Sequence, residues 1–468
     1  MRKNDDAEKP KLLTKGETAE LLGIGIDLSK LPDTRGLFIS DKILFYKDSL
    51  CVGNESAFTG SVFYNCSVSS DFKNNEVLNL YCRWISGGAA LFNLSYSDLT
   101  DADLTGADLT DANLTSAGMR HSILSNANLT NAKLEGADLI NAILKDANLI
   151  GANLTGAKIG HSKLTNANLT NANLTGADLQ WANLINVNLT EAKLIETNLT
   201  RANLTGANFT RIDIVQSNFR KASLIDANLK EVKLTGINFT DAYLSGANLS
   251  GANISDANLT NANLFETNLS GASITHADLT GAKLLSANLS GANLTSANLT
   301  SANLTGANLT GVNLRSVSLF VADLTRAKLS DANLSDANLT RAKLTGANLE
   351  GANLTGADLT GAYLLDANLT GANLSGTNLS GAYLVRAKLE GASFSGADLT
   401  GADLADVLFI NANFAGATYN ERTELPPIDF PRNIIDSMQF VAIDYVEDEP
   451  VGKDEGEGKD EGDEDSYW

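Results

Sequence analysis

Histidine and cysteine are the side chains that most often bind a transition metal, and cysteine is also a strong nucleophile; this sequence has three of each. The cysteine count is odd and no two cysteines are separated by two residues, so neither a disulfide framework nor a zinc site is predicted. The sequence has no P-loop, nucleophile elbow or dinucleotide-binding fingerprint. The residues concerned are Cys51, Cys66, Cys82, His121, His161 and His276.

The three histidines lie in a strictly periodic region, so the elements that carry them depend on that period. From Leu94 to Phe414 every fifth residue is a large apolar side chain, which gives 65 consecutive pentads. The centre is nearly always Leu, and the residue two before it is small, usually Ala. A period of five fits neither a helix nor a simple strand. Self-similarity of this kind is a property of repeat folds.

A backbone that turns a corner every five residues returns to the same orientation every five residues. Four corners close a square coil of twenty residues, and the next coil stacks on it at the strand spacing of roughly 4.8 Å. The centre and the small residue two before it then point inward. Corner positions are rich in Gly, Asp, Asn and Ser, and all six prolines lie outside the pentads. Turn residues at corners and no Pro in a hydrogen-bonded ladder both favour this geometry.

In this geometry the histidines cannot share a metal ion. His121 and His161 occupy the same corner two coils apart, which is roughly 10 Å. His276 lies on another corner. Zinc ligands lie about 2 Å from their metal. A solid rod filled with leucine also has no concave pocket, so we expect no enzyme activity, no cofactor and no small-molecule substrate.

The pentad Ala307-Asn308-Leu309-Thr310-Gly311 and its repeats resemble the pentapeptide-repeat family. The resemblance covers about 320 residues of the chain. It implies an all-β solenoid, a right-handed quadrilateral β-helix, which agrees with the square coil. Sixty-five pentads would make about 16 four-sided coils and a rod on the order of 77 Å long.

Five segments are predicted from the changes in sequence texture. Residues 1–32 contain a capping box at Thr14 to Glu17 and a short helix from Thr18 to Leu22. Residues 33–90 are expected to form degraded coils and a junction. Residues 91–420 are the repeat β-helix, and 421–446 are expected to form a C-terminal cap. Residues 447–468 are rich in Asp, Glu, Gly and Lys and are expected to be a disordered acidic tail, with solubility as its role.

The N-terminal twenty residues are charged and no run is long enough to span a bilayer, so we expect a cytoplasmic protein without a membrane span. The first predicted helix is similar to that of an excisionase-type helix-turn-helix, but no recognition helix follows. We therefore expect no direct nucleic-acid binding.

One side of the predicted rod differs from the other three. Because the phase never breaks, position modulo twenty labels the side, and the side with centres Leu104, Leu124 and onward to Leu404 carries eleven large apolar residues at outward positions. The other sides carry two or three each. An apolar stripe indicates an interaction surface. The eleven are Ile123, Ile143, Ile185, Ile225, Tyr243, Phe265, Leu285, Tyr363, Leu365, Tyr383 and Val385.

The sequence therefore predicts a non-catalytic scaffold or interaction rod that binds a protein partner or another copy of itself. Coverage of the stripe by residues 1–90 or by the C-terminal segment, and chance scatter, are the alternatives.

The resemblance also implies a second function, since some family members mimic DNA and bind type II topoisomerases. Residues 91–414 hold 28 acids and 20 bases, a net charge of −8, whereas B-DNA of the same length carries roughly 45 charges. A third possibility is ice binding by a Thr ladder at Thr240, Thr260, Thr280 and Thr300.

Overall fold

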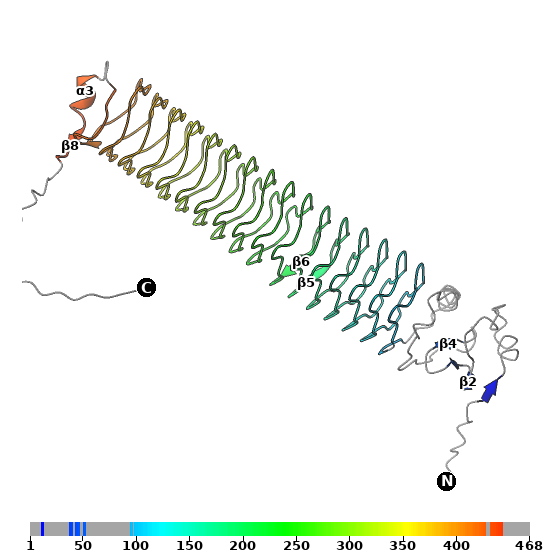
Figure 1. Ribbon diagram of the computed structural model, residues 1–468. Coiled ribbons are helices and arrows are strands. Elements are labelled where there is room, and N and C mark those ends of the chain that lie inside the picture. Colours follow the sequence, from blue (N-terminus) through cyan, green and yellow to red (C-terminus); the bar gives the residue numbers. More distant parts are fainter. Residues whose placement is uncertain are drawn as a thin grey trace, which may run out of the picture.

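The computed structural model describes residues 94–96, 98–426 and 431–442, together with the backbone of four short N-terminal strands. Residues 98–426 form a long solenoid that rises steadily from the cyan end to the orange end of the chain (Figure 1). Neighbouring coils pair in parallel with a constant register of twenty residues, for example Asn248 with Asn268. The same register holds from Asp98 with Gly118 to Asp398 with Thr418. The chain therefore makes one turn in four pentads.

In a pentad with Asn or Asp before the centre, every backbone N–H has its own acceptor, as the pentad Ala247–Gly251 shows. Ala247 donates to Leu244 O across the corner at 3.0 Å, and Asn248 donates to Ala227 O of the preceding coil at 2.9 Å. Leu249 and Gly251 donate to carbonyls of the following coil, at 2.7 and 2.8 Å. The fifth N–H, of Ser250, donates to the side-chain Oδ1 of Asn248 at 3.1 Å. Asn and Asp therefore precede the centre because they supply the acceptor that no backbone carbonyl provides.

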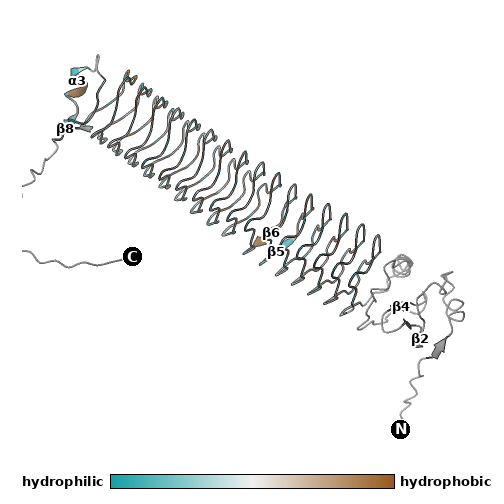
Figure 2. Ribbon diagram, in the orientation of Figure 1, coloured by the Kyte–Doolittle hydropathy of each residue, from teal (hydrophilic) through white to brown (hydrophobic). Residues whose placement is uncertain are grey.

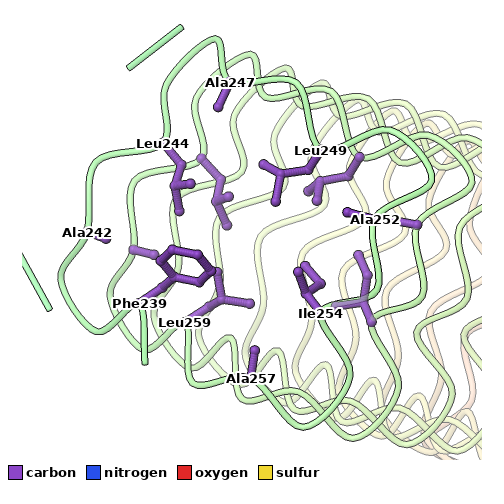
Figure 3. Close-up of a cluster of buried hydrophobic side chains, with 14 of the residues drawn as sticks. Phe239, Ala242, Leu244, Ala247, Leu249, Ala252, Ile254, Ala257 and Leu259 are labelled. Atoms are coloured by element: carbon purple, nitrogen blue, oxygen red, sulfur yellow. The ribbon is translucent and has the colours of Figure 1, made fainter. Parts of the chain in front are cut away.

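The inside of the solenoid is a continuous apolar core. The central leucines point toward the axis, as Leu244, Leu249 and Leu259 do in Figure 3. The alanines, such as Ala247 and Ala252, lie close to the wall. Nearly all of these side chains are completely buried. Brown and teal alternate along the coils, so no coil is uniformly apolar (Figure 2). This inward set is the one that the period of five predicts.

Each corner residue has a left-handed backbone, with φ between +53° and +69°. Gly, Asn and Asp tolerate this region, but it strains a β-branched residue. Val321 nevertheless occupies a corner with φ +57° and is 39% exposed. Its conformation is held by the coil and costs about 1–2 kcal/mol.

We predict that Val321→Asn raises the free energy of unfolding by about 1 kcal/mol, because Asn relieves this strain without adding the chain entropy of Gly. Asn261→Val, at the same corner three coils away and with φ +56°, is the matched control and should lose a similar amount. Chemical denaturation of the two variants and the parent measures both effects. Equal stabilities of all three proteins would contradict the assignment of strain.

Two adjacent corners are built differently. Strands β5 (Lys193–Ile195) and β6 (Asp213–Val215) pair in parallel there. Instead of bonding across the corner, Thr197 N–H donates to Ser217 Oγ at 3.1 Å, and that hydroxyl donates to Leu194 O. Thr197 and Ser217 are both buried. The Ser217 hydroxyl, from the following coil, thus bridges the Thr197 N–H and the Leu194 carbonyl, which would otherwise bond directly to each other across the corner.

Ser217→Ala is expected to lower the free energy of unfolding by about 1–3 kcal/mol, because it removes the partner of the Thr197 N–H and of the Leu194 carbonyl. Ser162→Ala is the control: its buried hydroxyl donates to Ile159 O at 2.6 Å, but the Ser162 N–H reaches the same carbonyl. Thermal unfolding should separate the two variants. If they are equally stable, the proposed role of Ser217 is wrong.

The N-terminal strands are β1 (Lys11–Leu13), β2 (Leu37–Ser40), β3 (Ile43–Tyr46) and β4 (Leu50–Val52). They pair in the order β1-β2-β3-β4, and every pairing is antiparallel. Coils stack in parallel, so these strands do not have the pairing expected of degraded coils in residues 33–90. The rest of that range, the helix predicted from Thr18 to Leu22 and the acidic tail at 447–468 lie outside the described residues.

At the C-terminal end of the solenoid, β7 (Thr418–Tyr419) pairs in parallel with β8 (Gln439–Phe440), and the short helix α3 (Arg432–Ile435) precedes β8 (Figure 1). Met438 is buried and Ile434 packs partly buried against the core. These contacts place apolar side chains of 431–442 on the last coil.

Candidate interaction face

The histidines and cysteines form no metal site among the residues that the structure describes, where no group of three or more His, Cys, Asp or Glu side chains could hold an ion. His161 instead stacks on Trp181, with ring centroids 6.1 Å apart, and Arg201 lies 4.4 Å from the centroid of the Trp181 ring. Cys51 lies in β4, while Cys66 and Cys82 are outside the described residues.

The eleven apolar residues predicted from the sequence lie on one side of the solenoid, in two columns on either side of the buried centres. We call this side, with the Leu104 to Leu404 centres, the apolar face. The column before the centres contains Ile123, Ile143, Tyr243, Tyr363 and Tyr383, and the column after them contains Ile185, Ile225, Phe265, Leu285, Leu365 and Val385.

None of these eleven side chains is buried. The tyrosines are the most exposed, with 51% for Tyr243, 45% for Tyr363 and 46% for Tyr383. Phe265 and Leu285 are also exposed, and the other six are half-buried. Within the described residues, therefore, no segment of the chain covers the face.

The tyrosines and isoleucines before the centres occupy positions where Asn or Asp would stabilise the rod. At Asn353 the Oδ1 atom accepts the Thr355 N–H at 3.1 Å, as in most pentads. The side-chain acceptor of a Tyr at 363 or 383 is the phenolic oxygen at the far end of the ring, which cannot turn back to the N–H two residues later. Each such position gives up a hydrogen bond worth about 0.5–1.5 kcal/mol. The apolar residues of this column therefore lack the hydrogen bond by which Asn or Asp stabilises the pentad.

The densest part of the face is at Tyr363 and Tyr383, which pair in adjacent coils. Their rings stack with centroids 5.1 Å apart and an interplanar angle of 7°. Leu365 and Val385 follow on the same two coils. At the neighbouring corner, Arg386 makes two hydrogen bonds of 2.8 Å to Asp366, which lowers the pKa of that carboxyl.

Sequence reasoning missed the apolar residues at the corner that precedes the face. Trp181 and Val321 are corner residues, 48% and 39% exposed. A corner is expected to hold a turn former, so neither residue entered the count of outward apolar residues. Phe320, next to Val321 and also exposed, is one of the few apolar residues counted on another side. Exposed apolar side chains on other sides include Val215, Leu408 and Ile410.

The charges beside the face are of both signs. Burial by itself raises the pKa of Asp323, but hydrogen bonds from the Thr325 hydroxyl and N–H and the charge of Lys343 outweigh it, and the pKa is lowered. Asp323 and Lys343 pair in adjacent coils of the face. The carboxylate is thus ionised at neutral pH beside a lysine.

The Thr ladder on the adjacent side has its hydroxyl groups committed to the protein. Thr240 Oγ1 donates to Asn238 at 2.7 Å, and Thr300 Oγ1 donates to Asn298 at 2.7 Å. Thr280 Oγ1 donates to Asp278 at 2.5 Å and Thr260 Oγ1 donates to the same carboxylate at 3.2 Å. Each of these four hydroxyls therefore donates its hydrogen bond within the protein.

A family model described as pentapeptide repeats matches overlapping segments that together span residues 93–220, 222–315 and 322–418. Among curated proteins, none matches the chain. None of the helices in the described part of the chain has the length and apolar composition that a bilayer crossing requires.

Several solved structures are similar to the chain. HetL, a pentapeptide repeat protein involved in heterocyst differentiation regulation from Nostoc sp. strain PCC 7120, is 35% identical, with 50% of this chain and 89% of HetL covered and a TM-score of 0.24. A pentapeptide repeat protein from the Arabidopsis thaliana thylakoid lumen is 33% identical, with 24% and 63% covered and a TM-score of 0.10. QnrB1, a plasmid-mediated fluoroquinolone resistance protein, is 16% identical, with 47% and 91% covered and a TM-score of 0.22.

Proposed function

Because the chain belongs to the pentapeptide-repeat family, whose fold is a right-handed β-helix, we propose that it is a non-catalytic interaction rod of about 16 coils that binds protein through its apolar face. The observation that carries this proposal is the column of Tyr and Ile side chains at positions where Asn or Asp would stabilise the fold. Exposed apolar groups that lower stability and cluster on one side are the mark of a binding surface.

The rest of the chain fits a binding rod. A core that is filled with leucine and alanine leaves the outer surface as the part that can bind. Residues 421–446 would close the C-terminal end, since Met438 packs onto the last coil. The acidic segment at 447–468 would keep the rod soluble, and its composition is compatible with a cytoplasmic location.

A DNA-mimic role at a topoisomerase receives less support, because a mimic needs dense negative charge. Cations recur along the solenoid, and several are paired with neighbouring acids, as Arg211 is with Glu191 at 2.8 Å. Such pairs neutralise the surface that a mimic would present.

Photo-cross-linking tests the proposal without assuming the identity of the partner. A photoreactive phenylalanine analogue replaces Leu365 on the apolar face or, as the matched control, Thr355 at the equivalent position of another side. After irradiation of intact cells, we expect a discrete protein adduct from position 365 and none from 355. The same adducts from both positions, or none from either, would contradict a binding role for this face.

A further inference from the structure

The apolar face has a partly symmetric pattern when it is read from its two ends. The constant register lets us count coils outward from two central coils, which hold Leu244 and Leu264. In the column before the centres, Ile123 and Tyr383 each lie six coils from the central coils, toward opposite ends of the rod. Ile143 and Tyr363 both lie five coils out. In the column after the centres, Ile225 and Leu285 both lie one coil out.

The polar positions follow the same symmetry. Two coils out, the pairs are Asn203 with Asn303 and Thr205 with Thr305. Lys163 and Lys343 both lie four coils out, and Asp103 and Asp403 both lie seven coils out. Six of the eleven apolar residues therefore recur at symmetric heights in their own column, and several polar residues do so as well.

The corner that precedes the face adds an independent match. Trp181 and Val321 are both exposed and both have a strained backbone. Each lies three coils from the central coils, toward opposite ends of the rod. This pair was not part of the sequence pattern from which the face was defined. Two unusual residues at one corner thus agree with the centre that the face itself gives.

We propose that the face binds a second copy of this chain in an antiparallel two-fold dimer, whose axis crosses the rod between the coils of Leu244 and Leu264. This proposal rests on the proposed function and names its partner. The axis runs across the face, so each column lies opposite the same column of the other copy. Ile123 then contacts Tyr383 of the second copy, Ile143 contacts Tyr363, and Trp181 contacts Val321. Each contact occurs twice, as an isologous interface requires.

A parallel dimer would match fewer of the same residues, because it would place only Tyr363 opposite Leu365 and Tyr383 opposite Val385 as apolar pairs. Its axis would run along the rod and would place the two columns opposite each other at equal height. Ile143 would then face Lys145, Tyr243 would face Ser245, and Leu285 would face Lys283. In the antiparallel arrangement the two copies of Tyr243 lie about one coil spacing of 4.8 Å apart across the axis, and so do the two copies of Phe265.

The area of the face supports a second copy as the occupant, and Asp323 lies where it can offset the two lysines that the arrangement places opposite each other. From the coil of Ile123 to that of Tyr383 the face is roughly 62 Å long, and its extended width of about 10 Å gives about 1,200 Å² for two copies, the lower bound of stable interfaces. Lys163 lies opposite Lys343 of the other copy, and the ionised Asp323 is one coil from that position. Asp323 can therefore contact Lys343 of its own chain and Lys163 of the second copy.

Five of the eleven apolar residues have no apolar mate in their own column. Next to the axis, Tyr243 faces Asn263 of the second copy and Phe265 faces Ser245. Leu365 faces Lys145 of the second copy, Val385 faces Ser125, and Ile185 faces Thr325. Each of these last three lies on a coil that already carries a matched residue, Tyr363, Tyr383 or Trp181. The alkyl stem of Lys145 and the methyl group of Thr325 can cover part of their surface.

Distances between single spin labels in the full chain test the arrangement. Cys51, Cys66 and Cys82 are replaced by Ser, and one label is attached at Asn186→Cys, Asn166→Cys or Asn126→Cys, which lie on one exposed corner beside the face. In the antiparallel dimer the separation along the rod between the two copies of a label is 7, 9 or 13 coils, or roughly 34, 43 and 62 Å. The distance therefore rises by roughly 10 Å for each coil outward.

Two other outcomes would overturn the dimer. One short distance shared by all three labels would indicate a parallel pair. The absence of any dipolar coupling, with monomers in sedimentation, would remove the second copy as partner. In either case a discrete adduct from the photoreactive group at position 365 would leave the proposed function standing, and its mass would distinguish a copy from a different protein.

Discussion

The variant Tyr363→Asn, Leu365→Thr, Tyr383→Asn, Val385→Thr is expected to lose association by at least tenfold while the solenoid stays as stable as the parent. Association falls because the densest apolar patch of the face becomes polar, and a buried apolar side chain contributes about 1.5–3 kcal/mol. Analytical sedimentation over a concentration series measures it. Calorimetry of the same samples measures stability.

Stability is preserved for a reason particular to this fold. The variant loses the stacked pair of tyrosine rings, which is worth about 0.5–1.5 kcal/mol. It gains two side-chain acceptors for the N–H groups at 365 and 385, each worth about 0.5–1.5 kcal/mol. A loss of association therefore cannot be ascribed to unfolding.

The control for this variant is Leu408→Asn with Ile410→Thr. Both residues are exposed, 50% and 68%, and both lie off the apolar face. We expect this pair to associate as the parent does. If the control loses association as strongly as the face variant, general surface hydrophobicity rather than the face causes self-association.

Leu249→Ala is expected to have the largest effect on stability, a loss of about 2–5 kcal/mol. Leu249 is completely buried and points at the axis among Leu244, Ile254 and Leu259 (Figure 3). The square coil cannot collapse onto the cavity, because its backbone is hydrogen-bonded to the coils above and below. Leu365→Ala, a half-buried leucine on the outside, should cost much less.

Because each coil contacts only its neighbours, the loss should be local. Hydrogen exchange should accelerate in the coils around residue 249 and remain slow near residue 129, six coils away. Uniform acceleration along the rod would show that the solenoid unfolds as one unit and would contradict this expectation.

Much of the fold could be predicted because the conformation of each pentad depends mainly on its own residues. Leu and Ala at fixed places predict the inside, and Gly, Asp and Asn at the fifth place predict a corner, since these choices depend only on residues within one turn. The reason that Asn or Asp precedes most centres comes from the structure, where its Oδ1 atom accepts the N–H two residues later.

The exceptions could not be predicted, because they depend on the residue one coil away. In the sequence Ser217 resembles any other small residue. In the structure its hydroxyl accepts a hydrogen bond from the N–H of Thr197, twenty positions earlier. Residues 33–90 were expected to form degraded coils, whereas β2, β3 and β4 within that range pair antiparallel. Local spacing alone does not distinguish these pairings.

The sequence by itself determined which side chains of the repeat point inward and that one side of the rod is more apolar than the others. Only the tertiary structure showed that the apolar residues before the centres take the place of an Asn or Asp side-chain acceptor. It also showed that Trp181 and Val321 lie at a strained corner beside them, and it confirmed the coil-to-coil register that sets their positions along the rod. The physical reason is that a period of five fixes orientation within a coil, whereas contacts between coils link residues twenty apart and depend on the closed backbone.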